Sequence, residues 1–199
     1  MRSGADVQIT ETDYGWFFDG EGEENALIFY PGAKVEETAY APLLREIAKR
    51  GIDVCLVKMP LRFAVFGANK AEKVMREYEY DHWYIGGHSL GGAMAADFAA
   101  TKGDGLDGVI LLAAYSTKKL DQHLDVVLIY GSEDKVLSME KYSKYMRNVP
   151  DMTSEHIIGG GNHAQFGSYG PQKGDGKALI PPEEQVNKTV DAILKKVKP

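Results

Sequence analysis

Ser89 lies at the centre of the segment Gly87-His88-Ser89-Leu90-Gly91, which has the pattern Gly-x-Ser-x-Gly. An apolar run, residues 83–85, precedes it, and a run of small residues, 93–100, follows it, so the segment joins a predicted strand to a predicted helix. A serine on so tight a turn adopts strained backbone angles, and a Cβ at either flanking glycine would collide with the turn or a neighbouring strand. The turn exposes a hydroxyl near a helix N-terminus, where negative charge is stabilised. This context favours a nucleophile elbow over a glycine-rich turn without chemistry.

A serine hydroxyl is a poor nucleophile at neutral pH, so it needs a neutral imidazole to take its proton. His163 is the predicted base because it follows a predicted strand and the glycine run 159–161, at the carboxyl edge of the sheet. His88 adjoins the nucleophile and is predicted to be structural, with its side chain pointing away from the reacting face. The other histidines occupy a strand start, a polar connection and the inside of a strand: His82, His123 and His156.

The imidazole needs a carboxylate to orient it. Two carboxylates, Glu133 and Asp134, follow the apolar strand 126–130. Asp134 is the predicted acid because the turn would present it to the loop face, although an Asp at this place could also only cap the turn. Asp121 and Asp125 precede the strand and therefore belong to the opposite edge.

Stabilising the oxyanion of an acyl transfer requires two backbone N–H groups. The residue after the nucleophile, Leu90, is expected to supply one. The turn 31–34, after the apolar run 26–30, is expected to supply the other, from Ala33 with Lys34 as the alternative. Pro31 has no N–H to donate. The Lys34 side chain could also place a cation near the site, but an exposed lysine is the favoured interpretation.

These residues require a scaffold that brings strand ends together. Continuous apolar runs alternate with amphipathic segments, which predicts a mostly parallel sheet with helices on both faces, an α/β fold. The start of the chain reads as a hairpin. No composition break divides the chain, so residues 1–199 form one predicted domain. The predicted strands are 7–12, 14–18, 26–30, 53–57, 83–87, 108–114, 126–130 and 154–158, and the predicted helices are 36–50, 69–80, 89–102, 138–147 and 182–198.

Composition excludes several classes of protein. The 29 acidic and 23 basic residues give a net charge of −6, which argues against nucleic-acid binding, and the basic cluster 195–198 reads as a solvated helix end. No apolar run of about 18 residues occurs, so no membrane span is expected.

The single cysteine, Cys55, cannot form an intrachain disulfide and lies in an apolar run. The sequence shows neither metal-ligand spacing nor a nucleotide-binding glycine pattern, so we expect no metal or cofactor. The N-terminus does not resemble a signal peptide, which favours the cytoplasm, with export after removal of a leader as the alternative.

Four segments together resemble the compact, cap-less bacterial α/β-hydrolases near the dienelactone hydrolases: residues 30–33, 87–91, 131–134 and 161–167. The chain order Ser89, Asp134, His163 is that of the α/β-hydrolases. The resemblance, which runs from about residue 26 to 198, implies these three residues as nucleophile, acid and base. Dienelactone hydrolases carry a cysteine nucleophile where this chain has serine, and their His-Gly before the oxyanion residue is Pro31-Gly32 here.

The connection 115–125 is too short for the helical cap that many lipases insert, so the predicted site is open and suits short acyl esters or an ester at the end of a larger molecule. The apolar run 59–66 could line an acyl pocket or be core under a loop. The segment 166–180 could form a mobile wall beside His163 or be disordered.

The predicted function is hydrolysis of small-molecule carboxylic esters through an acyl-enzyme. Thioester hydrolysis or acyl transfer would use the same residues. A catalytically silent hydrolase fold that binds a ligand or partner is the alternative from another class. The sequence leaves the oligomeric state open.

Overall fold

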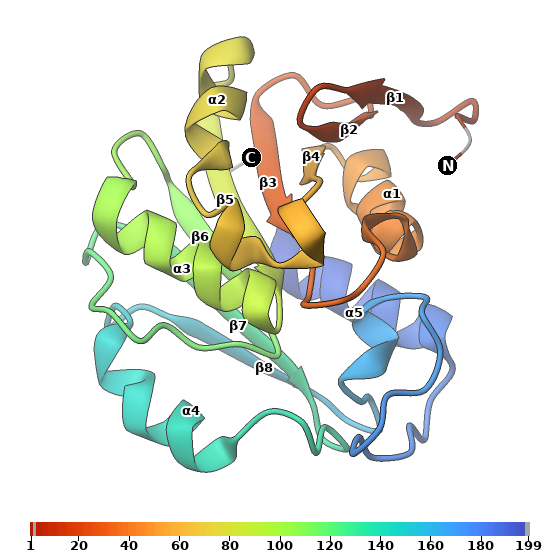
Figure 1. The fold of residues 1–199 in the computed structure, drawn as a ribbon, viewed down its shortest axis with the longest axis vertical. Helices are drawn as coiled ribbons and strands as arrows, with labels where there is room; N and C mark the ends of the chain where they lie inside the picture. The colour runs from red at the N-terminus through yellow and green to blue at the C-terminus, as the bar shows by residue number, and fades with distance from the viewer. Residues whose placement is uncertain (2, 198–199) are drawn as a thin grey trace.

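The computed structural model describes residues 1 and 3–197, which form an eight-stranded sheet covered by helices (Figure 1). The strand order is β1-β2-β4-β3-β5-β6-β7-β8. β1 and β2 form an antiparallel hairpin, and β2 joins β4 antiparallel, whereas the strands from β4 to β8 are parallel. The strands are β1 Gln8–Thr12, β2 Gly15–Asp19, β3 Asn25–Tyr30, β4 Asp53–Val57, β5 His82–His88, β6 Gly108–Leu112, β7 Asp125–Gly131 and β8 Ser154–Ile158.

Helices cover both faces of this sheet, as the alternation of segments predicts. α2, α3 and α4 pack on one face, and α1 and α5 pack on the other (Figure 1). Five short 3₁₀ helices lie in the connections. The helices are α1 Ala41–Lys49, α2 Lys70–Glu77, α3 Leu90–Lys102, α4 Met139–Tyr145 and α5 Pro182–Leu194, and the 3₁₀ helices are η1 Glu37–Tyr40, η2 Pro60–Arg62, η3 Ala64–Phe66, η4 Met146–Asn148 and η5 Ala164–Phe166.

The central strands explain the continuous apolar runs. Every residue of β3, β4 and β6 is buried, because helices cover both sides of each. β8 lies at the sheet edge and alternates between more and less exposed residues. All parallel strands end at one edge of the sheet, which is the edge where an open α/β fold carries its site.

Several predicted boundaries are wrong. The single helix predicted over 36–50 is a 3₁₀ turn followed by α1, because Pro42 cannot donate a helical hydrogen bond to the turn before it. The strand predicted over 108–114 ends at Leu112, since Ala113 turns the chain with φ of 49°. The closing helix ends at Leu194, and its predicted last residue, Lys198, lies outside the described residues.

The connection between β6 and β7, residues 113–124, contains no helix, so the fold has no cap. Among the described helices, none combines the length and apolar character needed to cross a membrane.

Candidate functional site

Backbone strain is concentrated at the carboxyl edge of the sheet. Among the described residues, five that are not glycine have φ between 49° and 63°: Lys34, Leu61, Arg62, Ser89 and Ala113. Lys34 follows β3, Leu61 and Arg62 follow β4, Ser89 follows β5 and Ala113 follows β6. Left-handed backbone costs a non-glycine residue of order 1 kcal/mol or more, and such residues cluster at functional sites. The strain therefore marks the same edge that the sequence predicts for the chemistry.

Ser89 stands between β5 and α3 with φ of 54° and ψ of −122°. Its N–H donates to the Leu112 carbonyl at 2.9 Å, and its own carbonyl accepts from Ala93 N–H at 3.0 Å, which fixes the turn. A Cβ at Gly87 would lie 2.4 Å from the Tyr30 carbonyl oxygen, and one at Gly91 would lie 2.2 Å from it. Both flanking glycines are therefore required by the close approach of β3, as the elbow interpretation predicts. The serine itself is partly exposed.

His163 and Asp134 form a buried pair at this edge. Nδ1 of His163 lies 2.8 Å from Oδ2 of Asp134, and their side chains are 2% and 1% exposed. Oδ1 of Asp134 accepts from the N–H groups of Val136 and Leu137, each at 2.8 Å. Both carboxylate oxygens are thus occupied, and the imidazole ring is fixed by a hydrogen bond at Nδ1.

The other carboxylate considered for this role, Glu133, is bonded to the Ser132 hydroxyl at 3.0 Å and does not pair with His163. Both residues follow β7, but the turn directs only Asp134 into the protein.

The structure contains no hydrogen bond between Ser89 and His163. Nε2 of His163 is buried and has no hydrogen-bond partner among the described residues. The ring centroid of His163 lies 4.4 Å from that of His88, the residue directly before Ser89. The base candidate is therefore adjacent to the elbow with its second nitrogen unoccupied. Catalytic hydrogen bonds are often long without substrate and shorten when it binds.

His88 does not point away from the site as expected, since its ring packs on that of His163. It is 1% exposed and lies in an aromatic cluster with Tyr40, Phe166 and Tyr169. The Tyr40 hydroxyl accepts from Gly32 N–H at 3.0 Å and lies 2.8 Å from Nδ1 of His88. Burial, and then the neighbouring His163, hold the pKa of His88 well below its usual value, so this ring is neutral.

The turn after β3 offers one uncommitted amide. Gly32 N–H is bonded to Tyr40, and Lys34 N–H donates to the Arg62 carbonyl at 2.9 Å. Ala33 N–H has no acceptor among the described residues, and the same holds for Leu90 N–H at the start of α3. Of the two residues considered as the second oxyanion donor, Lys34 is thus already engaged, and Ala33 is available.

The loop that carries His163 is tied to α5. Asn162 N–H donates to Oε1 of Gln185 at 2.9 Å, and Nε2 of Gln185 donates to the Asn162 carbonyl at 2.8 Å. Gln185 is fully buried, so this reciprocal pair satisfies both backbone groups of the residue before the base.

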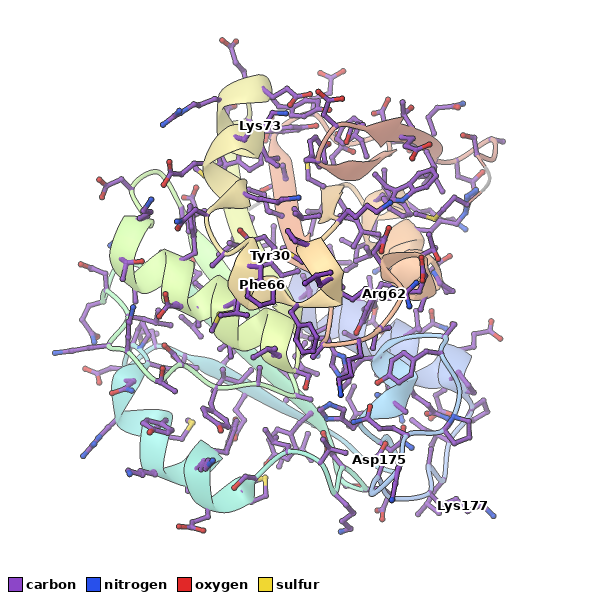
Figure 2. The ribbon with its side chains drawn as sticks, viewed as in Figure 1. Tyr30, Arg62, Phe66, Lys73, Asp175 and Lys177 are labelled. Atoms are coloured by element: carbon purple, nitrogen blue, oxygen red, sulfur yellow. The ribbon has the colours of Figure 1, made fainter. Side chains whose placement is uncertain are left out.

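The segment 166–180 is ordered, contrary to the alternative of disorder. Asp175, labelled in Figure 2, accepts from Ala164 N–H at 2.9 Å, and Ser168 N–H donates to the Ala39 carbonyl at 2.7 Å. A cavity of about 700 Å³ lies under this segment, lined among others by Asn162, Gln165 and Asp175. Ser89 is not part of its lining, so the cavity is not the place where an acyl group would meet the nucleophile.

The described residues contain no group of three or more His, Cys, Asp or Glu side chains that could hold a metal. Cys55 is fully buried, and burial raises the pKa of its thiol to about 12. This cysteine therefore has little thiolate character and is no rival to Ser89 as nucleophile.

The sequence profile of the alpha/beta hydrolase family matches residues 26–187. No curated protein matches the chain in sequence. Solved structures share its fold at low identity. A protein described as a predicted CIB-like hydrolase from Thermoplasma acidophilum is 18% identical, with a TM-score of 0.71 over 98% of this chain and 100% of that one.

A dienelactone hydrolase from Anabaena variabilis is 11% identical, with a TM-score of 0.70 over 97% of this chain and 100% of that one. A protein from Thermus thermophilus is 14% identical, with a TM-score of 0.68 over all of both chains. At these identities the likeness concerns the fold alone.

Proposed function

The chain belongs to the alpha/beta hydrolase family, and we propose that it is a serine hydrolase that cleaves carboxylic esters with Ser89, His163 and Asp134. The observation that carries the proposal is the buried His163–Asp134 hydrogen bond of 2.8 Å beside the strained elbow of Ser89. A buried carboxylate on Nδ1 leaves Nε2 as the basic nitrogen, and that nitrogen has no partner within the described chain.

In the proposed reaction, Ser89 Oγ attacks the ester carbonyl carbon while Nε2 of His163 takes the hydroxyl proton. The N–H groups of Ala33 and Leu90 stabilise the oxyanion, since both are free of other acceptors among the described residues. The protonated His163 then gives its proton to the departing alkoxide, which leaves an acyl-enzyme. Water, deprotonated by His163, then attacks the acyl carbon, and the protonated His163 gives the proton to Ser89 Oγ as the acid leaves.

Asp134 holds the ring of His163 in one tautomer and stabilises the imidazolium that forms in each step. Its Oδ1 is anchored by two backbone N–H groups, so the carboxylate keeps a fixed position while the charge on His163 changes. An anchored carboxylate is what an orienting role requires.

The substrates that suit this site are esters with short acyl groups, or an ester at the end of a larger molecule, because no cap encloses the edge. Thioester hydrolysis and acyl transfer remain compatible with the same residues. A silent fold used only for binding is the second class of function. The buried His163–Asp134 pair beside the strained elbow of Ser89 favours the enzyme, since a fold used only for binding has no need of an oriented base at that place.

The test is the intact mass of the protein after exposure to a fluorophosphonate. We expect a single adduct on the native protein, no adduct on Ser89→Ala, and a full adduct on Ser143→Ala, a matched change at an exposed serine of α4. The native protein and Ser143→Ala should also hydrolyse p-nitrophenyl acetate, and Ser89→Ala should not. Native protein that is folded and yet takes no adduct would overturn the triad and favour the binding module.

A further inference from the structure

Apolar side chains face solvent on the segment between β4 and α2. Leu61 is 81% exposed, Val65 54% and Phe66 62%, and together we call them the η2–η3 platform. The sequence suggested either an acyl pocket or core under a loop for this run. Only Met59 and Ala64 of the run are fully buried, so most of it is not core.

The platform stands on a fixed base. Met59 and Ala64 anchor it in the hydrophobic core, and η3 packs against α3, the helix that begins just after Ser89. The Tyr30 hydroxyl donates to the Ala68 carbonyl at 2.7 Å and accepts from Ala71 N–H at 3.0 Å, which fixes the chain that follows. Figure 2 labels Arg62 and Phe66 on this segment, in front of the sheet. The exposed side chains therefore belong to a held surface and not to a loose loop.

Two contacts of Arg62, the residue after Leu61, hold the platform segment against the oxyanion turn and the residues just after it. Lys34 N–H donates to the Arg62 carbonyl at 2.9 Å, and the Arg62 guanidinium pairs with the Glu36 carboxylate. Lys34 directly follows Ala33, the proposed oxyanion donor. The platform is thus attached next to the place where the ester carbonyl would be held.

Leu61 is unfavourable in two respects at once. It has φ of 52°, a conformation that costs a leucine free energy, and it holds an apolar side chain almost wholly in water. Neither feature helps the fold. Local strain and exposed apolar groups that persist beside a site are typical of ligand recognition.

We propose that the η2–η3 platform binds an apolar group of the substrate ester, so that the enzyme prefers esters with a hydrocarbon chain or ring over acetates of small polar alcohols. This inference rests on the proposed function. Its occupant is the substrate because the platform is joined to the oxyanion turn and packs on the nucleophile helix. A stable protein interface usually contains about 20–30 residues on each side, so three side chains form too small a surface for one.

The test compares kcat/KM along two ester series, in the native protein and in variants. One series lengthens the acyl chain of p-nitrophenyl esters from acetate to butyrate, within the short acyl groups that the open site suits, and the other lengthens the alcohol of acetate esters. Leu61→Asn and Phe66→Gln remove apolar surface, and Asn tolerates the left-handed backbone at position 61. Met152→Gln is the control, because Met152 is 78% exposed and precedes β8 at the opposite edge of the sheet.

We expect native kcat/KM to rise by roughly fourfold for each methylene that the platform covers. In one of the two series, Leu61→Asn and Phe66→Gln should each reduce the preference for the longest ester over the shortest by about tenfold. Met152→Gln should leave both this preference and the rate of fluorophosphonate labelling unchanged. The series that responds identifies the acyl or the alcohol side.

Equal chain-length preference in native and variant proteins in both series would overturn the platform while leaving the proposed hydrolase intact. A uniform loss with every ester would also overturn it, since that result places the residues in the support of the turn. Conversion of a native dimer to a monomer by Leu61→Asn, measured by light scattering, would make the surface an interface between copies. Native protein that is inert to fluorophosphonate and all esters refutes the proposed function itself.

Discussion

The hydroxyl of Tyr40 lies 2.8 Å from Nδ1 of His88, and this contact links the oxyanion turn to the base. The same hydroxyl accepts from Gly32 N–H, so Tyr40 joins the backbone of the oxyanion turn to the ring of His88. The ring held in this way packs 4.4 Å from His163. One tyrosine thus positions the backbone beside Ala33 and the ring beneath the proposed base.

Tyr40→Phe is the direct test of this link. The variant keeps the ring but leaves Gly32 N–H and His88 Nδ1 buried without partners, which should lower the free energy of unfolding by about 2–4 kcal/mol. We also expect kcat for p-nitrophenyl acetate to fall, because the oxyanion turn and His163 lose a common support. Urea unfolding and steady-state kinetics measure the two effects.

Tyr169→Phe serves as the control, since among the described residues the Tyr169 hydroxyl bonds only to Gln172, three residues away. It should change stability and kcat little. A Tyr40→Phe protein with native kcat would show that the link is not needed for catalysis.

The neutral state of His88 makes stability depend on pH in a defined direction. Its folded pKa lies well below the unfolded value of about 6.5, so below that pH the unfolded chain binds a proton that the folded chain does not. The stabilising contribution is therefore fully present above pH 6.5 and is lost as pH falls below it, at up to about 1.4 kcal/mol per pH unit. Urea unfolding between pH 5.0 and 7.5 measures this slope.

His88→Asn should reduce the slope, because the Asn amide can still hydrogen-bond the Tyr40 hydroxyl and does not titrate. A smaller slope of the same sign should remain in His88→Asn, because burial and the nearby Lys195 also lower the pKa of His156. An unchanged slope in His88→Asn would contradict the assignment.

The sequence could predict the elbow of Ser89 but not the contact between Tyr40 and His88. The elbow depends on local rules, since neighbouring glycines and flanking periodicity lie within one stretch of chain. The order of strands and helices likewise follows from local pattern, and the structure confirms it. The pairing of Asp134 with His163 could be predicted because each residue follows a strand of a parallel sheet, and the carboxyl ends of such strands meet at one edge.

Tyr40 and His88 are 48 residues apart, and no spacing rule connects a tyrosine in one 3₁₀ turn with a strand-end histidine. Periodicity identifies which residues are buried but not which buried polar groups meet. The engagement of Lys34 N–H with the Arg62 carbonyl was beyond prediction for the same reason. The division of the helix at Pro42 was different, since the proline itself carried the signal.

The roles of the two carboxylates after β7 can be separated by isosteric changes. Asp134→Asn should lower kcat by about 10³–10⁴-fold, because the amide no longer fixes the His163 tautomer or stabilises the imidazolium. Glu133→Gln should retain kcat within about twofold, as this side chain bonds only to Ser132 in the described chain. Steady-state kinetics, with circular dichroism as a check on folding, decides between them. Equal losses in both variants would remove Asp134 from its proposed role.

Gln185 offers the last test, because it acts on the base through the backbone alone. Gln185→Leu keeps the volume but leaves N–H and C=O of Asn162 buried without partners, so unfolding free energy should fall by roughly 2–4 kcal/mol. His163 is the next residue, and we expect kcat to fall with little change in KM, since the base is displaced while the platform is not. Asn187 is an exposed residue of α5, two positions after Gln185, so Asn187→Leu should change neither the free energy of unfolding nor kcat. Lower stability with native kcat would mean that the Gln185 pair secures the fold and leaves the position of His163 to its bond with Asp134.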